Sequence, residues 1–321
     1  MRGFRIDARF AATAVVALGF AGAAPHWAAA QGAPGGQDDC ILWKQMEGAV
    51  KDVDLKAAIA TERAIDLEMD CSRRAAAAKK AVLDVFRAQD SRMEREKAAP
   101  KDRLAQLEAS LKYANKWNAW DIHAKIADLQ RKVPGSKDNA KISMAYDRAL
   151  VAIDEMPEAQ RPPASEIGKL SRLAYQFEAL AVGDGTPIKR DGGFTRSARQ
   201  ITVGYVPAPL QFEFDKDELT LAGKAQAQIL LAQLKARGMP ELHLVGHTDP
   251  VGTFEYNDDL SLRRAAAIKK FLTDNDYPSN KITIAGRGKR DATTYKIEDR
   301  SSFTEAEIHQ MLRRVELKFK D

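Results

Sequence analysis

The spacing of apolar residues changes once along this chain, near residue 200, and the change separates two kinds of structure. From Cys40 to about Val182, apolar residues recur every three or four positions, the spacing of helices that bury one face. Proline-containing breaks separate these segments, so we expect an all-α domain of antiparallel helical hairpins over residues 40–182. Beyond residue 200, strand-like and helical segments follow one another, which predicts an α/β domain over residues 201–321, with a sheet covered by helices.

Three shorter segments lie outside these two domains. Residues 1–30 combine a basic start, a short apolar run and small residues before Gln31, the pattern of a secretory signal peptide that is removed on export. The apolar run is shorter than the roughly 20 residues that a spanning helix needs, so we expect no transmembrane segment in the mature chain. Residues 31–39 and 183–200 are rich in glycine and polar residues, and we interpret them as a flexible lead-in and an interdomain linker.

The helical domain carries one weak repeat-like signal. The stretch AYDRALVAI, residues 145–153, is faintly similar to the second helix of a tetratricopeptide repeat. No clean period of about 34 residues accompanies it, so this domain stays unassigned. It could bind an envelope protein, but the sequence names no partner and no oligomeric state.

The charged residues argue against a nucleic-acid-binding protein. The chain of 321 residues has a formal net charge of +5, and its basic and acidic residues are interleaved rather than gathered in one patch. We interpret them as solvated helix faces, and we expect no nucleic-acid partner.

Cys40 and Cys71 are the only cysteines. A pair in an exported protein is more often a disulfide than a metal site. Zinc would require four ligands, and no histidine lies near either cysteine in the sequence. We therefore expect a Cys40–Cys71 disulfide, with no metal and no cofactor.

The second domain should contain several strands and helices in alternation, and the helix after the third strand should be capped by Asn257, Asp258 or Asp259. The expected strands are 201–206, 210–215, 241–246, 281–286 and 314–319, and the expected helices are about 220–237, 259–274 and 304–311.

Polar residues follow the predicted strand 241–246. His247, Thr248 and Asp249 come directly after its carboxyl end, where α/β proteins often bind ligands. Arg264 lies on the next helix, on a face that could look back toward Asp249. A carboxylate and a guanidinium that face one pocket suit a zwitterion, because the acid pairs with an ammonium and arginine holds a carboxylate in its planar fork.

Three other interpretations compete with ligand binding. Ser261, His247 and Asp249 are the residue types of a catalytic triad, but Ser261 is expected inside a helix and the chain has no G-x-S-x-G motif. A metal site lacks a second dense cluster of ligands. Finally, Asp249 could simply cap a turn while Arg264 pairs with a neighbouring aspartate. The spacing alone does not decide between a ligand site and this last arrangement.

Five motifs occur in a fixed order along the second domain: FEFDKDEL (212–219), LVGHTDPVG (244–252), YNDDLSLRRA (256–265), IAGRG (284–288) and RRVEL (313–317). With these motifs, the segment from about 205 to 320 resembles the OmpA-like C-terminal domain, the peptidoglycan-binding module of Gram-negative envelopes. The resemblance implies an α/β fold with a mixed sheet covered by helices. It spans about a third of the chain, and residues 31–200 do not share it.

The resemblance also implies roles for individual residues. In that family the aspartate of the HTD motif binds the ammonium of diaminopimelate in the stem peptide, a role that falls on Asp249. The arginine of the LSxxRA motif binds the diaminopimelate carboxylate, a role that falls on Arg264. The other ligand-site residues that the motifs imply are Asn257, Thr248 and Leu260.

Some positions lie outside the family pattern. His247 is expected to pack the loop. Arg263 is no motif position and should face solvent or supplement the positive field of the site. Leu312 occupies the place of the usual asparagine, and residues 289–303 lack the usual proline. The sequence does not show whether these departures alter the pocket.

We therefore expect a periplasmic protein, associated with peptidoglycan and the outer membrane, that binds the wall noncovalently and tethers its helical domain there. An alternative is a helical scaffold or adaptor of an envelope protein complex, in which the C-terminal module only localises the chain. A cell-wall hydrolase is a distant third, since no catalytic residues are identified and no enzyme activity is expected. The preferred stem-peptide variant stays open.

Overall fold

The computed structural model describes residues 40–114, 119–133, 135, 138–181, 206–208, 210, 212–213 and 215–319. The expected signal peptide, lead-in and linker lie outside these residues, as does most of the expected strand 201–206. Among the described residues, no helix is long and apolar enough to cross a membrane.

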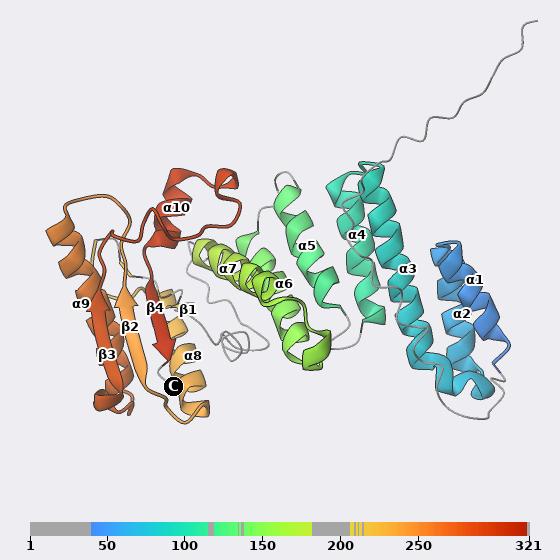
Figure 1. The fold of residues 1–321 in the computed structure, drawn as a ribbon, viewed down its shortest axis with the longest axis horizontal. Helices are drawn as coiled ribbons and strands as arrows, with labels where there is room; N and C mark the ends of the chain where they lie inside the picture. Colours follow the sequence, from blue (N-terminus) through green and yellow to red (C-terminus); the bar gives the residue numbers. More distant parts are fainter. Residues whose placement is uncertain are drawn as a thin grey trace, which may run out of the picture. The chain divides into compact units, whose positions relative to one another are not determined.

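The N-terminal region is all-α, as the apolar spacing predicts (Figure 1). Each helix contacts the next one along the chain. Local sequence fixes several helix starts: Asp54 and Asp138 accept backbone N–H bonds as N-caps, and Pro100 opens a helix at its first turn. The helices are α1 (Leu42–Lys51), α2 (Leu55–Leu67), α3 (Ala75–Arg95), α4 (Pro100–Ser110), α5 (Trp120–Lys132), α6 (Asn139–Asp154) and α7 (Ala164–Ala181), with short 3₁₀ turns such as η2 (Met69–Arg74).

The predicted disulfide is present. Cys40 and Cys71 are bonded, and both are buried. Cys40 lies two residues before α1 and Cys71 lies in the 3₁₀ turn η2, so the bond joins the two ends of the α1–α2 hairpin.

The C-terminal region is a mixed sheet covered by helices, which confirms the predicted α/β fold. The strand order is β1-β4-β2-β3. Strands β2 and β3 are parallel, whereas β4 runs antiparallel to both β2 and β1. Apolar residues of α8 and α9 pack with the strands in one core. The elements are β1 (Val206–Ala208), α8 (Leu221–Ala236), β2 (Leu242–Gly246), α9 (Phe254–Thr273), β3 (Ile282–Gly286), α10 (Glu305–Leu312) and β4 (Val315–Phe319).

The expected strand 210–215 is wrong for the residues that the structure describes. Phe212 forms only an isolated bridge with Leu219, outside the sheet. Asp215 adopts a left-handed backbone conformation with φ of 60°, and the Glu213 N–H donates to the Glu218 carbonyl. The segment therefore turns back on itself as a short hairpin, despite its alternating apolar pattern.

One hydrophobic core extends from the helical region into the segment between β3 and β4. Phe303 packs against Phe177 of α7 with ring centroids 5.5 Å apart. Leu312, which departs from the family pattern, is 1% exposed in this core. The other apolar residues of the segment that join it are Ala292, Ile297, Ile308 and Met311.

Candidate functional site

The candidate site lies at one edge of the sheet, where three chain segments meet. Gly246, the last residue of β2, pairs with Gly286 at the end of β3 and with Val315 at the start of β4. Because β4 is antiparallel to β2, residues after Gly246 meet residues before Val315. Three backbone bonds fix the meeting: His247 N–H to Arg314 O (2.9 Å), Thr248 N–H to Gly288 O (3.0 Å) and Arg287 N–H to Gly246 O (3.0 Å).

Helix α9 packs close to this edge because two strands end in glycine. A Cβ atom on Gly246 would lie 2.0 Å from the carbonyl oxygen of Ser261, and one on Gly286 would lie 2.7 Å from Ser261 Oγ. A larger residue at either position would push the helix away. Ser261 Oγ also donates to the Asp258 carbonyl and accepts from the Gly288 N–H, each at 2.9 Å, so it joins α9 to the loop after β3.

Helix α9 begins earlier than the sequence pattern indicated. Its N-cap is Thr253, whose hydroxyl accepts from the Tyr256 N–H, so the expected capping by residues 257–259 is wrong. Asn257 lies inside the helix and is buried. Its side-chain amide donates to the carbonyls of Val251 and Thr253, at 2.7 and 2.8 Å, and thereby ties the preceding loop to the first turns of α9.

Both carboxylate oxygens of Asp249 accept hydrogen bonds within the protein. Oδ1 accepts from the Val251 N–H at 3.0 Å, and Oδ2 accepts from the Arg313 guanidinium at 2.7 Å. The Asp249 side chain keeps 16% exposure. A carboxylate has about four acceptor positions, so it can still take an ammonium from a ligand.

Arg264 is 3% exposed, and its Nε donates to the carbonyl of Lys216 at 3.0 Å. Its guanidinium also lies 5.2 Å from the ring centroid of Phe212. The pKa of Arg264 is lowered to about 10: burial lowers it most, the Arg313 charge also lowers it, and the Asp249 charge opposes both. Among the described residues, no carboxylate forms an ion pair with Arg264.

The neighbouring Arg263 has a different environment, as the sequence predicts. It is more exposed, and it pairs with Asp259 at 2.8 Å and with Asp217 at 3.2 Å. Successive residues of a helix point about 100° apart, so adjacent arginines reach different partners. Arg263 is therefore satisfied within the protein, on a surface apart from Asp249.

The other two residues assigned to the pocket are buried. Thr248 is 2% exposed, and its hydroxyl donates to the Asp249 carbonyl at 3.1 Å. Leu260 is 4% exposed. These two residues shape the loop and the helix behind the site rather than offer open surface to a ligand.

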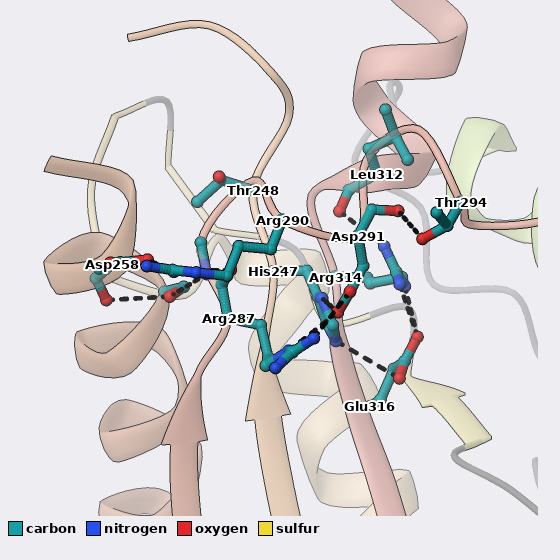
Figure 2. A network of polar contacts seen from close by, with 12 residues as sticks. His247, Thr248, Asp258, Arg287, Arg290, Asp291, Thr294, Leu312, Arg314 and Glu316 are labelled. Atoms are coloured by element: carbon teal, nitrogen blue, oxygen red, sulfur yellow. Dashed lines mark hydrogen bonds and ion pairs between the residues drawn. The ribbon is translucent and has the colours of Figure 1, made fainter. Parts of the chain in front are cut away.

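His247 belongs to a buried polar network next to the site (Figure 2). Its Nδ1 lies 3.4 Å from Asp291 and its Nε2 lies 3.3 Å from Glu316. Glu316 also accepts a bond of 2.7 Å from Arg314. Burial by itself would raise the pKa of Glu316, but the neighbouring His247 and the charge and hydrogen bond of Arg314 outweigh it, so the pKa is lowered.

The triad of Ser261, His247 and Asp249 is not assembled. Ser261 bonds to backbone groups of Asp258 and Gly288, and His247 contacts Asp291 and Glu316 instead of the serine or Asp249. In the described part of the chain, no three His, Cys, Asp or Glu side chains gather closely enough to hold a metal ion.

A cleft of about 430 Å³ lies beside the carboxyl end of β3, between α9 and the following loop. Its charged residues pair within the protein: Arg290 bonds to Asp258, Arg287 to Asp291, and Asp259 to Arg263. Because these charges are already paired within the protein, this cleft offers a charged ligand fewer unpaired groups than the site around Arg264 does. The residues that line it are Asp258, Asp259, Leu262, Gly286, Arg287 and Arg290.

Arg313 is the residue that sequence reasoning missed. It belongs to the motif RRVEL, but no role was expected for it. The signal was its position directly before a strand that pairs with β2, which places it beside the residues that follow β2. The structure brings it together with Asp249.

Comparisons with known proteins find the same family in this region. Residues 211–304 match the OmpA family. Outer membrane protein A of Bordetella avium is 37% identical over 78 residues, which are 24% of this chain and 40% of that protein. The putative lipoprotein YfiB of Escherichia coli is 34% identical over 101 residues, 30% of this chain and 61% of that protein. The chain therefore spans less than two thirds of either relative.

Among solved structures, the peptidoglycan-associated lipoprotein of Burkholderia pseudomallei is 25% identical. The match covers 35% of this chain and 88% of that one, with a TM-score of 0.29. The cell wall anchor of the type VI secretion system of Pseudomonas aeruginosa is 18% identical over 36% of this chain and 80% of that one, also with a TM-score of 0.29. These matches, like the sequence matches above, leave the N-terminal helical region unassigned.

Proposed function

We propose that this protein binds peptidoglycan noncovalently in the periplasm and recognises the diaminopimelate residue of the stem peptide. One observation carries the proposal: Arg264 is buried and forms no ion pair with a described carboxylate, while the acidic Asp249 is close enough to affect its pKa. A ligand that offers a carboxylate to Arg264 and an ammonium to Asp249 would satisfy both. The OmpA-family match over residues 211–304 supports the same class of ligand.

The helical region would be held at the wall by this module. Each charge-assisted hydrogen bond contributes roughly 1.5–3 kcal/mol, and association costs several kcal/mol. One pocket should thus bind one stem peptide weakly. Retention would depend on the many neighbouring stem peptides of the polymer, which favour rebinding.

Co-sedimentation of the full chain with purified sacculi tests the proposal. Asp249→Ala and Arg264→Ala should lower the pelleted fraction, at low and at physiological salt. Arg263→Ala is the matched control. It removes the same charge at the neighbouring position, from a side chain that already pairs with two aspartates. If folded Asp249→Ala and Arg264→Ala proteins pellet like the wild type, the pocket assignment is wrong.

A scaffold function of the helical region is a second candidate, and one observation favours it. Ile41, Leu67 and Met69 are 79%, 87% and 87% exposed, and all three lie within four residues of Cys40 or Cys71. Large apolar side chains gathered on a surface often mark protein contacts. Replacing Leu67 and Met69 by serine should then release a cross-linked envelope protein and leave sacculus binding unchanged. Release of soluble muropeptides would instead favour a hydrolase.

A further inference from the structure

Helix α7 of the helical region binds the 292–312 segment, which leads into β4. Gln176 is fully buried, and its side chain forms two hydrogen bonds with the backbone of one residue: Nε2 donates to the Glu298 carbonyl at 3.0 Å, and Oε1 accepts from the Glu298 N–H at 2.8 Å. Arg172 adds an ion pair of 2.7 Å to the Glu298 side chain. One turn of α7 therefore fixes both the backbone and the side chain of Glu298.

Helix α7 also forms hydrogen bonds with the end of α10. The Tyr175 hydroxyl donates to the Met311 carbonyl at 3.2 Å, and the Gln310 side chain donates to the Ala179 carbonyl at 2.7 Å. Met311 is itself fully buried against the helical region. Two residues later comes Arg313, which bonds to Asp249. The Arg313 side chain of the candidate site therefore lies only two residues along the chain from a contact of α7, at Met311.

The segment depends on this contact for its conformation. Without α7, the apolar side chains that it buries in the shared core would face water, and both hydrogen bonds between the Gln176 side chain and the Glu298 backbone would be lost. The segment would then keep its ends at β3 and β4 and the ion pair of Asp299 with Arg131 of α5. Arg313 lies between β4 and Met311, whose carbonyl accepts from Tyr175 of α7, so a change in the segment would reach it.

We infer that the helical region positions the ligand site. Gln176 and Tyr175 are positioning residues that hold Arg313 within hydrogen-bond distance of Asp249. The docking of α7 on the 292–312 segment and the binding of a zwitterionic ligand are then coupled. The inference rests on the proposed function for the identity of the ligand. Because coupling is reciprocal, a load or partner that pulls α7 away weakens wall binding, and wall binding tightens the contact with α7.

The test uses the full chain and a soluble muropeptide that contains diaminopimelate, with affinity measured by calorimetry. Gln176→Ala should weaken binding about fivefold or more, the lower end of typical coupling. Tyr175→Phe removes only the hydroxyl that bonds to Met311. It replaces Gln176→Ala in this test if that variant fails to fold, and it should also weaken binding. Ser143→Ala is the matched control, because this buried hydroxyl bonds to the Ala174 carbonyl of α7 and does not touch the segment; it should leave affinity unchanged.

A double-mutant cycle separates positioning from general destabilisation. In the Arg313→Ala background, Gln176→Ala should have no further effect on affinity, whereas independent losses would add. Additive losses, or equal effects of Gln176→Ala and Ser143→Ala, would overturn the inference.

Amide hydrogen exchange of the ligand-free chain gives a second readout, independent of the ligand. Gln176→Ala should speed exchange in residues 305–319, and Ser143→Ala should not. If exchange responds this way but the wild type binds no muropeptide, the positioning of the segment by α7 stands and the proposed ligand is wrong. If the wild type binds and Gln176→Ala changes neither affinity nor exchange, the proposed function stands and the inference fails.

Discussion

The Arg313 guanidinium donates a hydrogen bond of 2.7 Å to Asp249 Oδ2, across 64 positions of sequence. The Val251 N–H donates a hydrogen bond to the other carboxylate oxygen, Asp249 Oδ1. Two hydrogen bonds therefore orient the carboxylate, and this orientation would reduce the ordering cost of binding the proposed ligand. Arg313 also contributes to the lowered pKa of Arg264, so two arginines and one carboxylate share the site.

Arg313→Ala should weaken sacculus and muropeptide binding about tenfold. The substitution removes a cation that can face the ligand carboxylate, and it frees Asp249 to rotate; one charge-assisted hydrogen bond contributes about 1.5–3 kcal/mol. Arg313→Lys should fall between alanine and wild type, since lysine keeps the charge but not the planar fork. Calorimetry with a soluble muropeptide measures both variants. Tighter binding by Arg313→Ala would mean that Arg313 competes with the ligand ammonium for Asp249.

Arg264→Lys should bind more weakly than the wild type and more strongly than Arg264→Ala. Lysine keeps a cation, but it cannot both reach the Lys216 carbonyl through a planar Nε–H and present two further N–H groups to a carboxylate. The expected loss is about 1–2 kcal/mol of binding free energy, roughly the value of one such bond. Muropeptide titration of both variants measures it, with Arg263→Lys as the control. Equal affinity of Arg264→Lys and wild type would show that charge alone suffices.

The sequence predicts the two fold classes and the disulfide because each leaves a local signal. Helical spacing and period-two spacing differ within a few residues, and two cysteines allow only one intramolecular pair. The segment 210–215 shows the limit of this reasoning. Its alternation matches a strand, yet the left-handed Asp215 and the hairpin to Leu219 override it.

The site is only partly visible in the sequence. Asp249 and Arg264 follow from motif and spacing, but the Arg313–Asp249 pair depends on β4 lying antiparallel beside β2, a long-range pairing that no local pattern encodes. The same holds for Leu312. It looks like a departure at the pocket, and the structure shows it filling the core shared with the helical region.

Gly246→Ala should destabilise the protein by about 1–3 kcal/mol or more, the usual cost of overpacking. The new methyl group would lie 2.0 Å from a backbone oxygen of α9, which cannot rotate away. Gly48→Ala is the control, because nothing lies within 4 Å of its Cβ position and helix propensity favours alanine. Urea unfolding measures both. A wild-type midpoint for Gly246→Ala would mean that α9 does not pack closely against Gly246.

Glu316→Gln should reduce stability by about 3 kcal/mol at neutral pH, because it leaves the buried Arg314 without its carboxylate. The pKa of Glu316 is lowered in the folded protein, so its contribution is fully present above the ordinary value of 4.5 and is lost as the pH falls through the folded pKa. The difference between variant and wild type should therefore shrink below about pH 4.5. Urea unfolding from pH 3 to pH 7 measures it (roughly the range in which carboxylates titrate). A difference that stays constant with pH would contradict the assignment, and Glu305→Gln, at an exposed side chain, is the control.

Removal of the disulfide should destabilise the helical region and leave wall binding intact. The bond joins cysteines 31 positions apart, and loop entropy gives such a bond about 3–4 kcal/mol. Its ends lie at α1 and η2, which pack on α2 and α3 rather than on α7. The Cys40→Ala, Cys71→Ala double variant should thus unfold at a lower temperature in calorimetry, yet co-sediment with sacculi like the wild type at temperatures where both are folded. Oxidised wild-type protein treated with a reductant is the matched comparison and should unfold like the double variant. Loss of sacculus binding in a folded double variant would show that the first hairpin, and not only α7, supports the ligand site.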